Sequence, residues 1–189
     1  MRIISLDPSL RSFGIFTNED GATFSEVIQR EEKDRIEVLK WFCLHFAAEA
    51  AKKWDLMIVE GYAFNAGSKW IGPDGKVKAR SSSITVQAEV GGLVRGLFAA
   101  RGVPIIEVPI GTWKSVTGIS MKKGTTQYES DYLNEVAIKY KVRFETTDEA
   151  DAFLFYQTVK LSCTQNHPAV GTAKIRAQIE ALKIDPRKL

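Results

Sequence analysis

The sequence has few of the residues that characterise zinc-binding or disulfide-linked proteins. Its two cysteines, Cys43 and Cys163, stand alone, and its two histidines, His45 and His167, do not combine with them into the paired spacing of a zinc site. Two distant cysteines also fall short of the framework that holds small secreted domains together. The sequence therefore indicates neither a zinc site nor a disulfide scaffold, and we expect both cysteines to be buried apolar thiols.

Long apolar runs and a strong excess of one charge are also missing. No run approaches the ~20 apolar residues of a membrane-spanning helix, and the opening residues lack the pattern of a signal peptide. The 26 basic and 23 acidic residues leave a net charge of +3, which is too small to indicate a nucleic-acid partner by itself. We expect a soluble intracellular protein with no membrane partner.

The pattern of apolar residues predicts one compact α/β domain. Hydrophobic residues make up 44% of the 189 positions, which is enough for a sizeable core. Strand-like runs occupy residues 1–7, 12–17 and 22–29, and helical spacing follows over residues 34–53. The rest of the chain is expected to form strands at 56–59 and 103–108, a polar loop at 65–80, and helices at 81–101, 126–140, 148–161 and 173–183.

This order is an antiparallel meander followed by alternating helices and strands. It predicts a mixed five-stranded sheet flanked by helices. We assign residues 1–162 to this domain and residues 163–189 to a basic, partly helical C-terminal extension. In the extension, the basic residues Lys174, Arg176, Lys183, Arg187 and Lys188 outnumber the acidic residues Glu180 and Asp185.

Two acidic residues close strand-like runs. Asp7 follows an apolar run and precedes Pro8, and Glu60 closes the run 56–59. A carboxylate in this position lies beside a buried sheet, where an unpaired charge is costly unless a cation neutralises it. Taken alone, each residue is equally consistent with an acid that caps a turn.

A second acidic pair opens a helix. Asp148 and Asp151 are three residues apart, so at the start of a helix both side chains project from one face, whereas Glu149 points elsewhere. Thr146 and Thr147 are candidates for the N-cap. An acidic first turn also complements the helix dipole, so the pair by itself has a structural explanation.

Together the four carboxylates predict a metal site. Two strand ends and one helix start bring them to one rim of the sheet, and four acids in one place need a cation. Hard oxygen ligands suit Mg²⁺ or Mn²⁺, and two such ions about 3.5 to 4 Å apart hold both the attacking and the leaving oxygen of a phosphodiester. The expected chemistry is that of a nuclease without a nucleophilic side chain. The four acids are Asp7, Glu60, Asp148 and Asp151.

In these residues the chain resembles the RuvC family of Holliday junction resolvases, which have the ribonuclease H-like fold. Residues 3–14 look like the family's opening strand, Ile58-Val59-Glu60 like its second acid, and Asp148-Glu149-Ala150-Asp151-Ala152 like its closing pair. The match runs from residue 1 to about 160. The resemblance implies a cytoplasmic homodimer, of a bacterium or of a virus in its host cell, that binds four-way DNA junctions. It also implies two symmetric nicks that leave 5′-phosphates, with Mg²⁺ or Mn²⁺ as the cofactor, in DNA recombination and repair.

The resemblance implies roles for single residues as well. By position, the four acids become the metal ligands, and Lys114 matches a basic residue that contacts phosphate; the alternative is an ordinary surface lysine. Lys122 and Lys123 are both candidates for a second basic contact, because the spacing after Gly118 differs from the family pattern. The segment 69–80 looks like an insertion, so junction or sequence selectivity is expected to differ accordingly.

The loop at 65–80 is expected to contact DNA, because it follows Glu60 and so overhangs the predicted site. Basic side chains neutralise phosphates, and an aromatic ring that stacks on an unpaired base contributes about 1 to 3 kcal/mol in single-strand binders. Core packing is the alternative for each aromatic residue. The candidate contacts in and before this loop are Tyr62, Phe64, Lys69, Trp70, Lys76, Lys78 and Arg80.

A stripe of small side chains bears on the quaternary structure. Ala88, Gly92, Gly96 and Ala100 recur at four-residue intervals in the predicted helix 81–101. Glycine costs roughly 1 kcal/mol relative to alanine in a helix, so close packing is expected to compensate for it. The stripe packs either on the chain's own sheet or against the same helix of a partner in a two-fold dimer.

Three other functions stay open. A broader nuclease that cuts flaps, forks or RNA–DNA hybrids would use the same four acids. A non-catalytic junction-binding protein would keep the fold, although it would have no need of all four. An actin-like or sugar-kinase-like ATPase domain also begins with an aspartate-bearing strand, but its glycine-rich phosphate loops are missing here.

Overall fold

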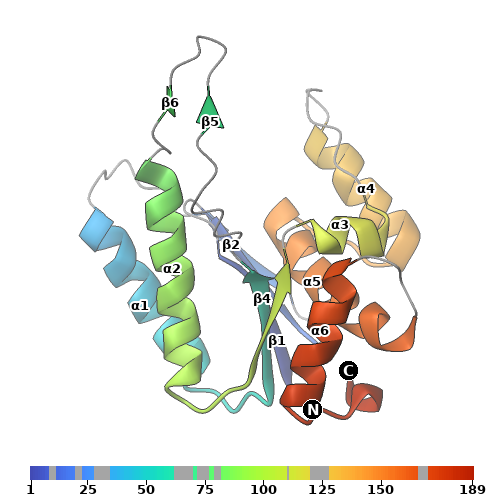
Figure 1. Ribbon diagram of the computed structural model, residues 1–189. Coiled ribbons are helices and arrows are strands. Elements are labelled where there is room, and N and C mark those ends of the chain that lie inside the picture. Colours follow the sequence, from blue (N-terminus) through green and yellow to red (C-terminus); the bar gives the residue numbers. More distant parts are fainter. Residues whose placement is uncertain are drawn as a thin grey trace.

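The computed structural model describes residues 1–8, 12–19, 23–27, 35–61, 70–71, 77–78, 82–109, 111–119, 128–165 and 170–189. Its main sheet is mixed, and helices cover both faces (Figure 1). The first three strands of the chain pair antiparallel, whereas the first, fourth and last pair parallel. The predicted mixed α/β architecture is confirmed. In spatial order the five strands are β3 (Thr23–Val27), β2 (Ser12–Thr17), β1 (Ile3–Pro8), β4 (Leu56–Gly61) and β7 (Ile105–Pro109).

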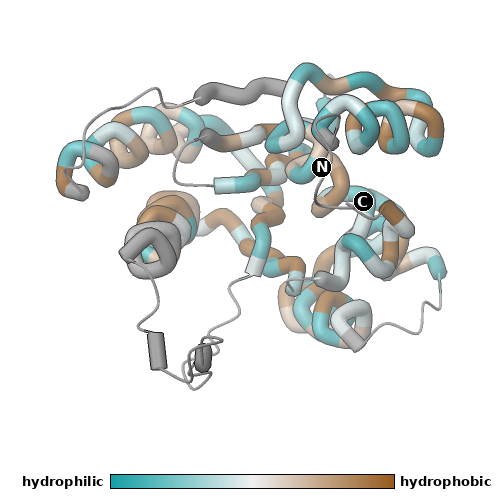
Figure 2. The backbone as a smooth tube through the Cα atoms, turned by 90° about the horizontal axis from the view of Figure 1, so that it is seen from above, coloured by the Kyte–Doolittle hydropathy of each residue, from teal (hydrophilic) through white to brown (hydrophobic). Residues whose placement is uncertain are grey.

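The helices form two groups on opposite sides of the strands, as the views in Figures 1 and 2 show. On one face α1 (Arg35–Ala50) packs on α2 (Ser82–Ala99). On the other face α5 (Thr147–Thr164) contacts β1 and β2. Around it lie α3 (Thr112–Thr117), α4 (Tyr128–Tyr140), α6 (Val170–Ala181) and the short 3-10 helix η1 (Pro186–Lys188). Among the described residues, no helix is long and apolar enough to cross a membrane.

Alternation of side chains along the strands divides the core into two layers. In β1, Ile3 is buried in the cluster around α5, whereas Ile4 is buried in the cluster that includes Phe42 of α1. In β4, Ile58 is buried in the cluster around α5, and Met57 is buried in the cluster that includes Phe42. Because successive residues of a strand face opposite sides, these positions define which way every other residue of β1 and β4 points.

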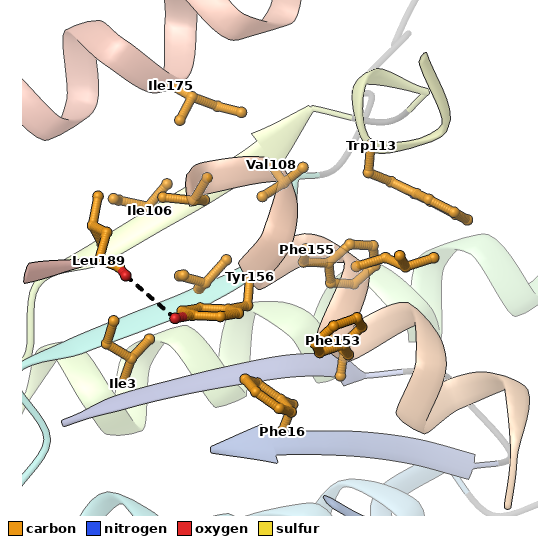
Figure 3. Packing of buried hydrophobic residues seen from close by; sticks show 14 of the residues in the cluster. Ile3, Phe16, Ile106, Val108, Trp113, Phe153, Phe155, Tyr156, Ile175 and Leu189 are labelled. Atoms are coloured by element: carbon orange, nitrogen blue, oxygen red, sulfur yellow. Dashed lines mark hydrogen bonds between the residues drawn. The ribbon is translucent and has the colours of Figure 1, made fainter. Parts of the chain in front are cut away.

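The layer around α5 is rich in aromatic rings (Figure 3). Phe153 and Tyr156 of α5 each pack on Phe16 of β2 with ring centroids 5.1 Å apart. The Tyr156 hydroxyl donates a hydrogen bond of 3.3 Å to the Leu189 carbonyl oxygen, and Ile175 of α6 is fully buried. The C-terminal extension therefore contributes to this layer, while its standing as a separate domain stays a prediction.

The side chain of Gln178 in α6 covers the edge of the sheet. Its amide oxygen accepts a hydrogen bond of 2.8 Å from the Glu107 backbone N–H, and its amide nitrogen donates one of 3.0 Å to the Glu107 carbonyl oxygen. These are the bonds that a further strand would make with β7. The side chain therefore blocks part of an edge that would otherwise be open to another chain.

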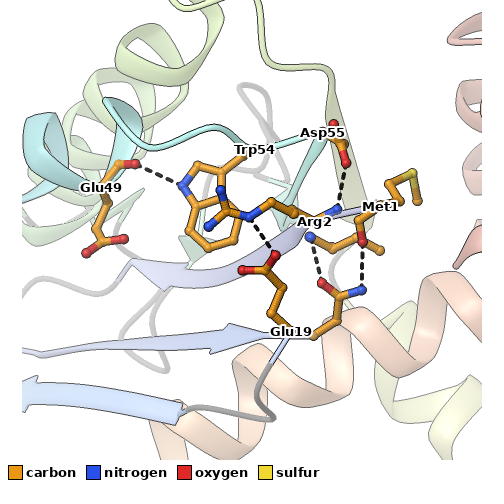
Figure 4. A network of polar contacts seen from close by, with 8 residues as sticks. Met1, Arg2, Glu19, Glu49, Trp54 and Asp55 are labelled. Carbon is orange, nitrogen blue, oxygen red and sulfur yellow. Dashed lines mark hydrogen bonds and ion pairs between the residues drawn. The ribbon is translucent and has the colours of Figure 1, made fainter.

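A polar network fixes the amino end of β1 (Figure 4). The Arg2 backbone N–H donates to Asp55 Oδ2 at 2.7 Å, and the Arg2 Nε lies 2.8 Å from Glu19 Oε1. The Arg2 guanidinium also lies 5.1 Å from the ring centroid of Trp54, whose indole N–H donates to the Glu49 carbonyl oxygen at 2.9 Å. The network joins the start of β1 to the turn before β4. It therefore helps to fix the register between these two parallel strands.

Cys43 and Cys163, expected to be buried, are half-buried, and two of the structural elements also differ from the sequence prediction. The segment 65–80, expected to be a loop, contains a short antiparallel pair, β5 (Trp70–Ile71) and β6 (Val77–Lys78). Strands of two residues are too short for alternation to reveal. The second difference is α3, a six-residue helix that was not predicted and that lies between Gly111 and Gly118, both with positive φ. The other predicted helices and strands are present, with ends that differ by a few residues.

Candidate active site

Asp7 and Glu60 lie at the carboxyl ends of neighbouring parallel strands. Leu6 of β1 is opposite Val59 of β4, so the next residue of each strand is one of the two acids. Leu6 and Val59 are both buried in the cluster that contains residues of α1 and α2. Alternation therefore turns Asp7 and Glu60 toward the other face, where α5 lies.

The start of α5 is fixed by a capping box. Thr146 is the N-cap, and its hydroxyl oxygen accepts a hydrogen bond of 3.3 Å from the Glu149 N–H. Glu149 Oε2 accepts in return from the backbone N–H groups of Glu145, at 2.8 Å, and Thr146, at 3.3 Å. Glu149 is buried and occupied by the cap, as expected from its place in the helix. Asp148 and Asp151 take no part in the cap, and the charges of both act on Asp7 at the end of β1.

Gly14 allows α5 to reach Asp7. Gly14 is the direct partner of Asp7 across the β1–β2 pair. A Cβ atom at Gly14 would overlap the carbonyl group of Asp148 and lie 2.6 Å from the Glu149 nitrogen. The first turn of α5 therefore rests directly on the backbone of β2, beside Asp7, and this contact is possible only without a side chain at residue 14.

The charges of the four predicted acids act on one another. Burial raises the pKa of Asp7 well above its usual value, and the charges of Asp151, Glu60 and Asp148 raise it further. Burial also raises the pKa of Asp151 to about 7, against a hydrogen bond from Tyr132, and Glu60 and Asp148 add to the rise. All four residues are half-buried. The structure thus brings the charges of the four acids together at one half-buried site.

Basic and hydrogen-bonding groups offset part of this negative charge. Burial raises the pKa of Glu60, whereas a hydrogen bond from Trp113 and the charges of Lys114 and Arg95 lower it. The charge of Lys114, which is exposed on α3, also lowers the pKa of Asp151. Arg95 of α2 donates to the Glu60 carbonyl oxygen and pairs with Glu107 at 2.6 Å. Lys114 is thus the predicted basic residue that lies beside the acids.

The residues present fit a divalent cation by their chemistry. The four carboxylates repel one another, and the pKa values of Asp7 and Asp151 are raised. Together they form an oxygen-rich site whose negative charge Mg²⁺ or Mn²⁺ would neutralise. Among the described residues, no three carboxylate, imidazole or thiolate groups are already placed to coordinate one ion together. Mg²⁺ usually keeps several water molecules and binds through one or two carboxylates plus a substrate phosphate, so a closed cage is not required.

The raised pKa of Asp151 gives a test of this fit that needs no substrate. The folded protein binds the Asp151 proton more tightly than the unfolded chain, whose aspartates ionise near 3.9. The stability gained from this group is fully present below the unfolded pKa and is lost as the pH rises through about 7. In EDTA we therefore expect the melting temperature to fall by several degrees between about pH 5 and pH 8.

Mn²⁺ should remove most of this fall, because neutralising the acids favours their charged forms in the folded state. The stabilisation by Mn²⁺ is thus expected to be larger at about pH 8 than at about pH 5. Thermal melts over this pH range measure the effect, and Asp151→Asn, which lacks one of the titrating groups, should show a smaller fall with pH. An equal Mn²⁺ shift at every pH would contradict the account.

Most predicted DNA contacts fall outside the part of the chain that the structure describes. Trp70 lies on β5 and Lys78 on β6, in the pair drawn above the start of α2 in Figure 1. The predicted contacts that lie outside the described residues are Tyr62, Phe64, Lys69, Lys76, Arg80, Lys122 and Lys123.

Three residues beside the acids had not been predicted from the sequence to contact them. Trp113 and Tyr132 are aromatic residues with apolar neighbours, so their sequence signal is that of core positions. Arg95 lies in a helix whose sequence does not show which strand end it reaches. The neighbouring Lys114 was the one available hint for Trp113, because it placed segment 112–118 near the site.

Solved structures of RuvC share this fold. The chain matches Thermus thermophilus RuvC in complex with a Holliday junction substrate with a TM-score of 0.58 and 12% sequence identity, over 88% of this chain and 97% of that chain. A second Thermus thermophilus RuvC structure gives a TM-score of 0.55 and 14% identity, over 88% of this chain and 98% of that one. No protein-family model and no curated protein matches the sequence. At this level of identity the likeness establishes the fold, which is the ribonuclease H-like fold of RuvC.

Proposed function

We propose that this chain is a metal-dependent, structure-selective DNA endonuclease that resolves four-way junctions in recombination and repair. The observation that carries the proposal is the mutual approach of four carboxylates at one end of the sheet. A fold alone does not imply an activity, but this fold is shared with RuvC, whose structure was solved with a Holliday junction substrate. The acids are Asp7, Glu60, Asp148 and Asp151.

The four acids are proposed to hold Mg²⁺ or Mn²⁺, with two ions in each site. When bound, such ions lower the pKa of the attacking water and stabilise the leaving 3′-oxygen. Asp7, on which the charges of all three other acids act, would hold the ions together with Glu60, Asp148 and Asp151. Lys114, exposed beside them, is proposed to hold a phosphate of the bound strand.

Branched DNA is the proposed substrate, and the basic and aromatic residues beyond Glu60 are proposed to contact it. Trp70 and Lys78 are paired neighbours in the β5–β6 ribbon, so one stacking ring and one cation are carried by the same short pair of strands. The same role is proposed for Tyr62, Phe64, Lys69, Lys76, Arg80, Lys122 and Lys123.

A panel of labelled substrates tests the proposed selectivity. The purified protein is incubated with a four-way junction, a flap, a fork, an RNA–DNA hybrid and a linear duplex of matched sequence, in Mg²⁺, Mn²⁺ or EDTA. We expect metal-dependent cutting of the junction in strong preference to the duplex. Equal cutting of every branched form would favour a broader debranching nuclease, and cutting of the hybrid alone would assign a different substrate. Tight junction binding with no cutting would indicate a non-catalytic binding protein.

A homodimer is the proposed assembly, with α2 as its contact. Gly92 and Gly96 of α2 are exposed, and a Cβ at either would meet no described atom within 4 Å. The stripe of small residues is therefore not packed on the chain's own sheet, which was the alternative expectation. An exposed helix with glycines on one face lets a second helix approach closely, and a two-fold dimer suits a substrate with two equivalent cleavage points.

Gly96→Glu tests this contact. The substitution introduces charge and bulk where the partner helix would lie, while glutamate favours the helix more than glycine does. We expect the variant to sediment as a folded monomer and to lose coordinated nicking of the two strands. Ala173→Glu, at an exposed small residue of α6, is the matched control and should keep the wild-type mass. A variant that remained dimeric at wild-type affinity would exclude α2 as the interface.

A further inference from the structure

Two aromatic side chains donate hydrogen bonds to two of the acids. The Trp113 indole N–H of α3 donates to Glu60 Oε1 at 3.2 Å. The Tyr132 hydroxyl of α4 donates to Asp151 Oδ1. Both aromatic residues are 3% exposed and belong to the hydrophobic cluster around α5. The donors thus come from two different helices and reach two different acids of the same site.

The aromatic rings are held in place by packing, so each ring presents its hydrogen-bond donor to an acid from a fixed position. Trp113 packs edge-on against Phe155 of α5, with ring centroids 5.8 Å apart and planes at 68°. On α4, Lys139 lies two turns beyond Tyr132 and donates to the Thr117 carbonyl oxygen at the end of α3. α4 is therefore tied to α3 through Lys139 and to α5 through Tyr132.

Other buried aromatic donors of this protein show what a purely structural arrangement looks like. The Trp54 indole donates to the Glu49 carbonyl oxygen at 2.9 Å, and the Tyr156 hydroxyl donates to the Leu189 carbonyl oxygen. Each satisfies its N–H or O–H with a backbone acceptor. Trp113 and Tyr132 instead donate to carboxylates, and each carboxylate has a second oxygen that this bond leaves available.

We propose that Trp113 and Tyr132 are positioning residues that orient Glu60 and Asp151 so that the second oxygen of each carboxylate faces the bound ion. This inference rests on the proposed function. A carboxylate with free rotation presents either oxygen in many directions, whereas one with an anchored oxygen presents the other in a narrow range. Outer hydrogen bonds of this kind set the affinity of metal sites, and their loss typically weakens binding about 10- to 100-fold.

Tyr132→Phe isolates this effect because it keeps the ring and removes the hydroxyl. We expect the Mn²⁺ concentration for half-maximal thermal stabilisation, and that for half-maximal cleavage, to rise about 10- to 100-fold. Tyr140→Phe is the matched control on the same helix. Its hydroxyl has no hydrogen-bond partner among the described residues, and its ring packs on Phe153 with centroids 5.4 Å apart. The control should keep both wild-type midpoints.

Should Tyr132→Phe fail to fold, Trp113→Phe tests the other hydrogen-bond donor. Its Mn²⁺ midpoints are compared with those of the control Trp54→Phe. A midpoint raised in Tyr132→Phe or Trp113→Phe, but in neither control, supports the inference. Wild-type midpoints in both variants, or no Mn²⁺ stabilisation of the wild-type protein, would overturn it. Thermal stabilisation by Mn²⁺ can be measured without cleavage. A shifted Mn²⁺ midpoint in a protein that cuts no DNA would therefore contradict the proposed function but support the positioning role.

Discussion

Asp7→Asn is expected to lower the rate of junction cleavage by at least about 1,000-fold, which corresponds to about 4 kcal/mol of lost transition-state stabilisation. The charges of the other three acids all act on Asp7. Asparagine keeps the shape of the side chain but removes the charge that would hold the ions. Single-turnover cleavage of a labelled junction in Mg²⁺ measures the loss, and binding to the junction in EDTA should be unchanged.

The same variant is expected to be more stable than the wild-type protein in EDTA. Burial and three like charges make the ionised Asp7 side chain unfavourable in the folded state, and the neutral amide relieves that repulsion. The melting temperature in EDTA at about pH 8 should therefore rise, whereas stabilisation by Mn²⁺ should largely disappear. Asp131→Asn, at an exposed acid on α4, is the control and should change neither property. Wild-type cleavage by Asp7→Asn would show that Asp7 is not a ligand.

Gly14→Ala is expected to lower both stability and activity, although it adds a single methyl group. The new Cβ would overlap the Asp148 carbonyl group, which belongs to backbone and cannot rotate away. Relief requires the first turn of α5 to move off β2, and overpacking of this kind costs about 1 to 3 kcal/mol or more. The movement would carry Asp148 and Asp151 away from Asp7, and a displacement of about 1 Å costs roughly 100-fold in rate.

Gly92→Ala makes the same chemical change at a position that is open within the chain, and it serves as the control when both substitutions are made in the monomeric Gly96→Glu background. A Cβ at Gly92 meets no described atom within 4 Å, and alanine is favoured over glycine in a helix by up to about 1 kcal/mol. Denaturant unfolding should thus show a loss for Gly14→Ala and a small gain for Gly92→Ala. Equal stabilities for Gly14→Ala and the wild-type protein would mean that α5 does not rest on β2 as described.

Apolar runs and helical periodicity explain why the sequence predicted so much of the fold. The continuous apolar runs of β1 and β4 and the helical spacing in α1 are each long enough to identify the element. The same elements predicted the positions of the acids, because residues at the carboxyl ends of neighbouring parallel strands lie at one edge of the sheet. Asp7 and Glu60 could therefore be predicted to lie at the same edge of the sheet, and Asp148 with Asp151 followed from the helix that they begin.

Contacts between distant segments explain what the sequence could not predict. Gly14 looks like any glycine in a strand, and only the approach of α5 shows why a side chain there is excluded. Trp113 and Tyr132 have the pattern of core residues, and they are core residues whose polar atoms happen to reach the acids. The six-residue α3 makes too little of a helical period to be recognised.

The most direct test of the proposed function is to map the cuts in a four-way junction, with each of the four strands labelled in turn, after incubation with Mg²⁺ or with EDTA. We expect cuts in Mg²⁺ at symmetry-related positions in two opposing strands, each leaving a 5′-phosphate, and none in EDTA or with Asp7→Asn. Cuts that persist in EDTA or with Asp7→Asn, or an intact junction in Mg²⁺, would contradict it.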